Sequence, residues 1–206
     1  GASDAPPAHG VRPVTALTPA DLLSLEQYAR ERPAFRERAI AHKRARRLAV
    51  GPNATWCFED RLTIQYQVQE MLRVERIFEV EGIADELGAY NPLIPDGSNW
   101  KVTLLIEFVD PALRARRLAE LRGIEARCWV QIAGHERVFA IADEDLEREN
   151  DEKTSAVHFL RFELEGTMIE AVRAGAPLRA GIDHPRYAHE VVVGDATRRA
   201  LIEDLK

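Results

Sequence analysis

Residues 61–108, RLTIQYQVQEMLRVERIFEVEGIADELGAYNPLIPDGSNWKVTLLIEF, decide the fold of this chain. Apolar residues recur at helical spacing through the first part, so the pattern predicts a long helix over 61–79. Gly82 interrupts this spacing, and a short second helix follows it. A loop with two prolines and an Asp-Gly pair comes next. The nearly continuous apolar run after the loop predicts a strand over 100–108 that is buried on both faces.

The chain before this stretch predicts two helices. Thr18 is followed by a proline and an acidic residue, which is a typical helix start. Pro33 is expected to end that helix, because the residue before a proline is disfavoured in the helical conformation. A second helix is then predicted over 33–47. Residues 1–16 are rich in Pro, Ala and Gly, so we expect a disordered tail and a single folded domain over 17–206.

The remaining strands and helices predict an α+β fold. Further strands are predicted at 48–50, 55–58, 127–132, 137–142, 156–164, 177–183 and 189–193, and helices at 110–122, 166–174 and 195–205. Strands cluster in the second half of the chain as consecutive hairpins, without regular β-α-β alternation. The expected architecture is therefore a mainly antiparallel, curled sheet of about eight short strands with helices packed on one side.

Composition excludes several classes of protein. The 206 residues carry a net charge of -6, which argues against a general nucleic-acid-binding surface. No apolar run reaches the roughly 20 residues that a transmembrane helix needs, and the N-terminus does not have the pattern of a secretory signal, so the expected location is the cytoplasm. The only two cysteines, Cys57 and Cys128, lie in predicted strands and are expected to be inert buried thiols rather than a disulfide framework or redox pair.

The common catalytic motifs are absent from the sequence. It contains no GxGxxG, GxxxxGK[ST], GxSxG or HExxH, which removes support for dinucleotide, P-loop, hydrolase-elbow and zincin chemistry. Glu-x-x-His is also absent, and with it the paired helical motif of ferritin-like di-iron proteins.

Charged and polar residues gather on the long helix and in the segment after it. The candidates for ligand or partner binding are Glu70, Arg73, Glu75, Arg76, Tyr90 and Asn91. Carboxylates and guanidinium groups on a rigid helix can bind a polar ligand, or dock a partner protein through bidentate pairs. The alternative is an exposed face whose charges pair with one another.

Histidines at predicted strand ends form a second group of candidates. His135, His158 and His184 can contribute to a transition-metal site, together with Asp183, His189 and Glu190. The spacing is not diagnostic of any metal, and a histidine in a turn such as His184 can equally be a capping residue.

The run from His42 to Arg47 is strongly basic. It can form an anion-binding patch. It can also complement the negative end of the preceding helix, which needs no ligand.

Three long segments carry a resemblance to a known family. They are TPADLLSLEQYARERPAFR, YQVQEMLRVERIFEVEGIADELGAYNPLIPDGSNWKVTLLIEF and GHERVFAIADEDLERENDEKTSAVHFLRFEL. From Leu17 to the last helix, the chain resembles the bacterial domain-of-unknown-function family 3501. That family has no established activity, so the resemblance brings no catalytic residues. It implies a context: such proteins are often encoded beside rubrerythrin-like and heterodisulfide-reductase-like iron–sulfur proteins, a setting of redox or peroxide metabolism.

Two hypotheses about function follow. The first is a non-catalytic accessory protein that binds an iron–sulfur or rubrerythrin-like redox partner through the Glu70–Arg76 helix face and the loop 91–95. The second is a metal-dependent or redox-linked enzyme, with a transition metal where that helix meets the strand-end histidines. A homodimer is compatible with either.

Overall fold

The structure is a computed structural model that describes residues 16–144 and 154–206. In this part of the chain the α-helices are α1 (Leu25–Lys43), α2 (Arg61–Glu75), α3 (Val80–Tyr90), α4 (Pro111–Glu120), α5 (Gly166–Arg173) and α6 (Asp195–Ile202). The strands are β1 (Arg47–Ala49), β2 (Ala54–Glu59), β3 (Asn99–Ile106), β4 (Cys128–Ile132), β5 (Val138–Phe139), β6 (Ile141–Ala142), β7 (Val157–Glu163), β8 (Leu178–His184) and β9 (Tyr187–Val192). The 3-10 turns are η1 (Pro19–Asp21), η2 (Arg44–Arg46), η3 (Asn91–Leu93) and η4 (Ile124–Arg127). No described helix is both long enough and apolar enough to cross a membrane.

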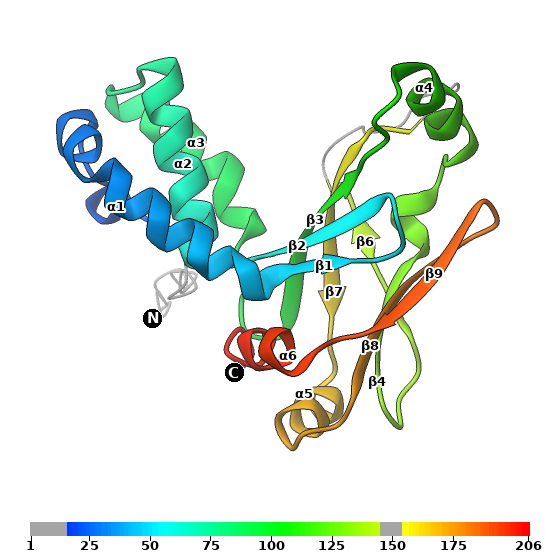
Figure 1. Cartoon of the computed structure of the whole chain (residues 1–206). Coiled ribbons are helices and arrows are strands. Elements are labelled where there is room, and N and C mark those ends of the chain that lie inside the picture. Colours follow the sequence, from blue (N-terminus) through cyan, green and yellow to red (C-terminus); the bar gives the residue numbers. More distant parts are fainter. Residues whose placement is uncertain (1–15, 145–153) are drawn as a thin grey trace, which may run out of the picture.

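The strands form two antiparallel sheets, which confirms the predicted α+β class (Figure 1). The first sheet has the order β1-β2-β3-β7-β6 and the second the order β5-β4-β8-β9. The predicted hairpin over 127–142 splits at Ala140, so that β5 pairs with β4 in one sheet and β6 pairs with β7 in the other. The inner faces of both sheets share one core with α4, α5 and α6. Within it, the Trp56 ring stacks on the Phe162 ring with centroids 5.3 Å apart.

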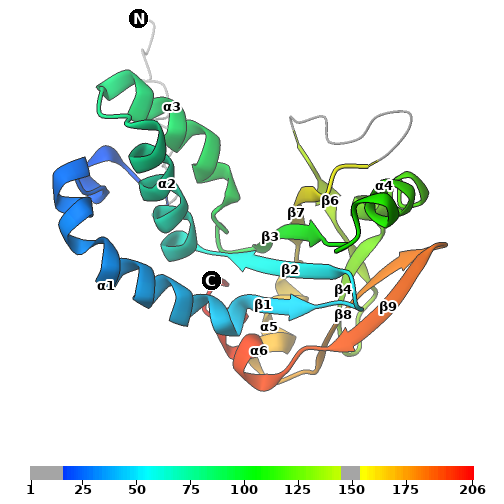
Figure 2. The ribbon, with the colours of Figure 1, turned by 45° about the horizontal axis from the view of Figure 1, so that its top comes forward.

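Helices α1, α2 and α3 form a separate helical lobe beside the first sheet, on the side away from the second sheet (Figures 1 and 2). We use this name for the three helices together with residues 16–24 and 91–94. The lobe has its own small core, made of Leu17, Ile64, Val68, Leu72, Leu87 and Ile94. The chain enters α2 directly from β2 and returns to β3 after η3, so the base of the lobe is attached to the first sheet.

Three predicted helix boundaries are wrong. The start predicted at Thr18 is only the 3-10 turn η1, and α1 begins at Leu25 with Ser24 as its cap. Pro33 lies inside the continuous helix α1, because Tyr28 and Phe35 on either side of it pack against each other with ring centroids 5.9 Å apart. Both side chains also contact α2, Phe35 by stacking on Tyr66 and Tyr28 by its hydrogen bond to Glu70, and these tertiary contacts together offset the roughly 3 kcal/mol that an internal proline costs. The long helix predicted to reach residue 79 ends at Glu75, because Arg76 adopts a left-handed conformation (φ 55°) and the Ile77 amide donates to the Leu72 carbonyl over 2.9 Å.

Tyr187 joins the second sheet to the hairpin between β1 and β2. Its hydroxyl donates to the Val50 carbonyl over 2.6 Å and accepts from the Asn53 amide over 3.0 Å. Gly51 lies beneath this hydroxyl with φ +74°, and a Cβ atom there would lie 2.5 Å from the Tyr187 oxygen. Only glycine satisfies both the backbone conformation and the close approach.

Arg46 is a buried cation at the base of the helical lobe, with only 2% of the residue exposed. Its guanidinium donates to both carboxylate oxygens of Asp204, over 2.7 and 2.9 Å. Its Nε lies 3.1 Å from Oδ2 of Asp60, and the other oxygen of Asp60 accepts from the Thr63 amide at the start of α2. Burial raises the pKa of Asp204 even though Arg46 opposes the shift. Arg46 therefore links the end of α1, the beginning of α2 and the C-terminal helix through paired charges.

Replacing Arg46 by alanine should lower the free energy of unfolding by about 3–5 kcal/mol, because it leaves the buried Asp204 carboxylate without its cation. Urea unfolding followed by circular dichroism measures this. Arg44→Ala, which truncates an exposed arginine of the same turn, is the control and should change stability by less than about 0.5 kcal/mol. Equal stability of the two variants would show that Arg46 does not hold these segments together.

Candidate functional site

Glu70 connects two helices of the lobe. Its carboxylate accepts from the Tyr28 hydroxyl over 2.8 Å and forms a two-point contact with the Arg32 guanidinium over 2.8 and 3.0 Å. The hydrogen bond from Arg32 lowers the pKa of Glu70 to about 2, against the opposing effect of burial and with further help from Tyr28. Glu70 therefore joins α2 to α1 through these contacts.

The other predicted binding residues lie in three different places, and one of them, Tyr90, lines the groove between the helical lobe and the first sheet. Arg73, Glu75 and Arg76 are exposed at the end of α2. Asn91 holds the backbone of Leu17, through hydrogen bonds of 2.8 Å to its amide and 2.9 Å to its carbonyl. That these residues bind a ligand or partner remains a prediction, and the three at the end of α2 are the ones exposed on the open surface.

Three large apolar side chains are exposed at the same turn. Val74 is 67% exposed, Phe78 71% and Val80 77%. Since α2 starts at the sheet and has 15 residues, the turn lies about 22 Å from its base. We call this surface the tip patch, and it consists of Arg73, Val74, Glu75, Arg76, Phe78 and Val80. Large apolar groups concentrated on a surface are typical of interaction sites.

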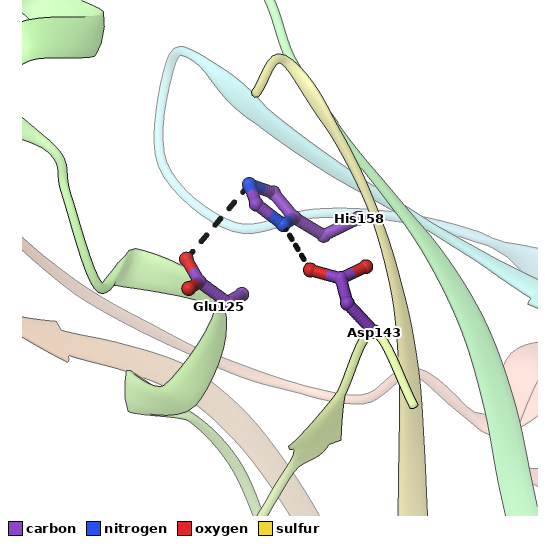
Figure 3. A group of neighbouring side chains, drawn as sticks. All are labelled: Glu125, Asp143 and His158. Carbon is purple, nitrogen blue, oxygen red and sulfur yellow. Dashed lines mark hydrogen bonds and ion pairs between the residues drawn. The ribbon is translucent and has the colours of Figure 1, made fainter. Parts of the chain in front are cut away.

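A histidine and two carboxylates meet at the end of β7 (Figure 3). Nδ1 of the fully buried His158 lies 2.5 Å from Oδ2 of Asp143, and its Nε2 lies 3.8 Å from Oε2 of Glu125. The Nε2 atom also lies 2.8 Å from the Thr154 hydroxyl. Among the described residues, these three side chains form a group whose possible metal-ligand atoms all lie within 4.8 Å of one another, which is close enough to hold a metal ion. His158 is thus the predicted histidine that the structure places next to other ligand side chains.

His135 and His184 do not belong to that group. Nδ1 of His184 accepts from the Arg186 amide over 3.0 Å, so its Nε2 carries the proton and donates to the Arg122 carbonyl over 2.9 Å. Both ring nitrogens of His184 are thereby used, one within the β8–β9 turn and the other on the segment after α4. His135 lies in the turn between β4 and β5, where its backbone amide donates to Ile132.

A groove separates the helical lobe from the outer face of the first sheet. Side chains of β2, β3 and β7 alternate between the core and this outer face. The register places Cys57, Thr103 and Phe159 in one cross-strand row of the groove floor. Glu59, Lys101 and Arg161 form the next row. The groove has a first chamber of about 370 Å³ and a second of about 810 Å³, and both are lined by Tyr90, Leu93 and Phe159.

The first chamber contains a carboxyl group with an altered proton affinity. Glu59 accepts from the hydroxyls of Thr63 over 2.8 Å and Thr103 over 3.3 Å. Burial raises the pKa of Glu59, against the opposing effects of the Thr63 hydroxyl and the Lys43 charge. Burial also raises the pKa of the neighbouring Cys57 thiol, which keeps this thiol protonated and unreactive at neutral pH.

The second chamber has a mixed charge. The Lys101 ammonium donates to the Pro92 carbonyl over 2.8 Å, and its pKa is lowered by burial and then by the charge of Arg161. Arg161 is itself paired with Glu144 over 2.9 Å. These charges therefore already have partners within the protein.

Sequence reasoning named Tyr90 and His158 as candidates, but not Glu59, Lys101 or Glu125. The alternation in the TWCFE segment was the available signal for Glu59, since it places Cys57 and Glu59 together on the side opposite Trp56. Nothing in the sequence indicates which helices cover that side.

The known proteins that are similar to this chain are themselves of unknown function, so they suggest no activity for it. Residues 16–205 match the family described as "Protein of unknown function (DUF3501)". The crystal structure of a novel protein of unknown function from Burkholderia pseudomallei is similar, with 48% sequence identity and a TM-score of 0.89 over 93% of this chain and 100% of that one. No curated protein matches the chain.

Glu70→Gln should reduce the acid sensitivity of the fold. The pKa of Glu70 is about 2 in the folded protein and near 4.5 in the unfolded chain. Its contribution to stability is therefore complete above pH 4.5 and is lost as the pH falls towards 2. We expect roughly 2 kcal/mol less stability for the variant at pH 7 and a smaller difference near pH 2.5.

Urea unfolding at both pH values measures this difference. Glu75→Gln, at an exposed position of the same helix, is the matched control. A stability difference between Glu70→Gln and the native chain that does not shrink in acid would contradict the ion-pair explanation.

Proposed function

Since this chain belongs to the DUF3501 family of proteins of unknown function, which brings no activity with it, we propose from its own residues that it is a non-catalytic accessory protein that docks a partner through the tip patch. The observation that carries this proposal is the exposure of Val74, Phe78 and Val80 within one turn. Each of these side chains would be stabilised by burial against another protein.

The surroundings of the apolar side chains support a protein partner. Arg73, Glu75 and Arg76 place both signs of charge beside them. An apolar centre with a polar margin is the usual arrangement of a protein interface, and arginine and aromatic residues contribute most strongly to binding there. The nearby Glu70 network holds α1 against α2, so the patch stands on a rigid support.

The partner we propose is an iron–sulfur or rubrerythrin-like redox protein. This choice follows from the family resemblance, which implies that such proteins are encoded nearby. The accessory role is accordingly proposed in redox or peroxide metabolism.

The double variant Phe78→Ser/Val80→Ser should weaken binding to the neighbouring iron–sulfur protein at least tenfold, because it removes two apolar contacts from the patch. Arg73→Ala should also weaken it, without a change in thermal midpoint. Calorimetric titration and co-purification are the measurements. Val109→Ser is the matched control, since Val109 is 99% exposed but lies between β3 and α4, outside the helical lobe. Undiminished binding by the double variant would rule out the tip patch.

A metal-dependent enzyme is the second candidate, and the Glu125–Asp143–His158 group favours it. In a metal site, Asp143 would orient the His158 ring through Nδ1. Nε2 of His158 already lies 2.8 Å from the Thr154 hydroxyl and 2.9 Å from the Ser155 carbonyl oxygen, so these contacts would have to be exchanged for the ion. His158 is completely buried, however, so the group offers a substrate no open position. This burial favours the first candidate.

Elemental analysis of untagged protein purified without chelator discriminates between the two candidates. For the accessory protein we expect no stoichiometric zinc, iron or manganese. One equivalent of metal that is lost in His158→Gln, while Glu136→Gln at an exposed glutamate retains it, would instead establish the metal centre.

A further inference from the structure

The first chamber of the groove combines positive charge with an apolar floor. Its lining includes three basic residues, Lys43, Arg46 and Arg47, and one acidic residue, Glu59. Arg46 is neutralised by Asp204 and Asp60. Lys43 and Arg47 form no ion pair with any residue of 16–144 or 154–206, and the Lys43 ammonium lies over the Tyr66 ring, 5.1 Å from its centroid. The two remaining cations are therefore available to a ligand.

Glu59 does not cancel this charge. Its carboxyl oxygens are held by the two threonine hydroxyls rather than by Lys43. Burial favours its neutral form and raises its pKa. Even when Glu59 is ionised, the available side chains of the chamber carry a net single positive charge, which is complementary to a monoanion.

The rest of the chamber suits an apolar ligand body. Phe58 lines it from β2 with its side chain turned to the core, and the other apolar lining residues are Ile64, Leu93, Leu105, Val157 and Phe159. The Gln67 amide and the Tyr90 hydroxyl also line it, and neither forms a hydrogen bond with the part of the chain that the structure describes. A mainly apolar wall with a few polar groups that orient the ligand is the usual composition of a small-molecule site.

We propose that the first chamber binds a small organic monocarboxylate with an aromatic or aliphatic body. Its carboxylate contacts Lys43 and Arg47, and its body lies on Leu105, Val157 and Phe159. The volume of about 370 Å³ is within the range of small-molecule pockets and accommodates a body of one or two rings. This function is separate from partner docking, because none of the residues of the tip patch lines the first chamber.

The first test is a titration with 2-naphthoate, using 2-naphthamide as the uncharged ligand of the same shape. We expect one site per chain and at least tenfold weaker binding of the amide, because a charged hydrogen bond is lost. Lys43→Met and Arg47→Met should each raise the Kd for 2-naphthoate about tenfold. Arg44→Met is the matched control, since this exposed arginine belongs to the same basic run but does not line the chamber, and its Kd should change less than twofold.

A thiol in the floor locates the bound ligand. Cys57 lines the chamber, whereas Cys128 is fully buried. Alkylation by iodoacetamide at alkaline pH therefore reports Cys57 in the folded protein. Bound 2-naphthoate should slow this alkylation at least fivefold in the native chain, and the protection should be lost in Lys43→Met at the same ligand concentration.

Four results would overturn the proposal. They are absence of saturable binding, equal affinity for the amide, an unchanged Kd in both Lys43→Met and Arg47→Met, and binding without protection of Cys57.

Phe78→Ser/Val80→Ser should bind 2-naphthoate normally, so a failure of the ligand-binding proposal and a failure of the docking proposal are distinguishable. Thermal midpoints of all variants identify any that are misfolded, and Lys43→Gln then replaces Lys43→Met.

Discussion

The arrangement of the molecule depends on the burial of the Arg46 guanidinium. A charge that has lost its hydration is tolerated only where opposite charges and hydrogen-bond acceptors surround it. Asp60 begins α2, Asp204 follows α6, and Arg46 itself follows α1, so three segments that are distant in sequence must meet at one point. Such an ion pair adds little net stability over a well-packed apolar core, but it strongly disfavours any other placement of these segments. The indole of Trp100 supports the same meeting point, through a hydrogen bond of 2.9 Å from its Nε1 to the Leu201 carbonyl.

Local patterns in the sequence predicted most of the elements, and the errors have physical causes. Hairpins and strands were predicted correctly where alternation and turn residues coincide, as in β1–β2 and β8–β9. The failures at Pro33 and Arg76 are cases in which tertiary packing and helix-end hydrogen bonds outweigh residue preference. A non-glycine residue in the left-handed conformation gives no sequence signal, because the same arginine is common inside helices. The strands divide between the two sheets at a single residue, Ala140. The residues around it form one uninterrupted strand-like pattern, so the sequence gives no sign of the break.

The candidate sites were less predictable than the fold. The spacing of residues shows which of them share a helix face, but it does not show which residue each charge on that face pairs with. For this reason the sequence was equally compatible with Glu70 in a docking surface and with Glu70 in an internal ion pair. The Glu125–Asp143–His158 group joins a 3-10 turn, the residue after β6 and the beginning of β7, which no sequence spacing connects. The basic run from His42 to Arg47 contains residues with different roles: Arg46 is buried and paired, while Lys43 and Arg47 face the groove. Sequence alone assigns these neighbours the same role.

The attachment of the helical lobe also affects how the chain folds. Strands β2 and β3 are antiparallel neighbours, a pair that a two-residue turn can connect, yet here residues 60–98 lie between them. Closing so long a segment costs conformational entropy before any ladder hydrogen bond forms. Formation of the α2–α3 hairpin shortens the effective distance between the strand ends, so the central pairing of the first sheet is expected to follow the helices in time. The lobe that covers the groove is thus also expected to set the order of assembly.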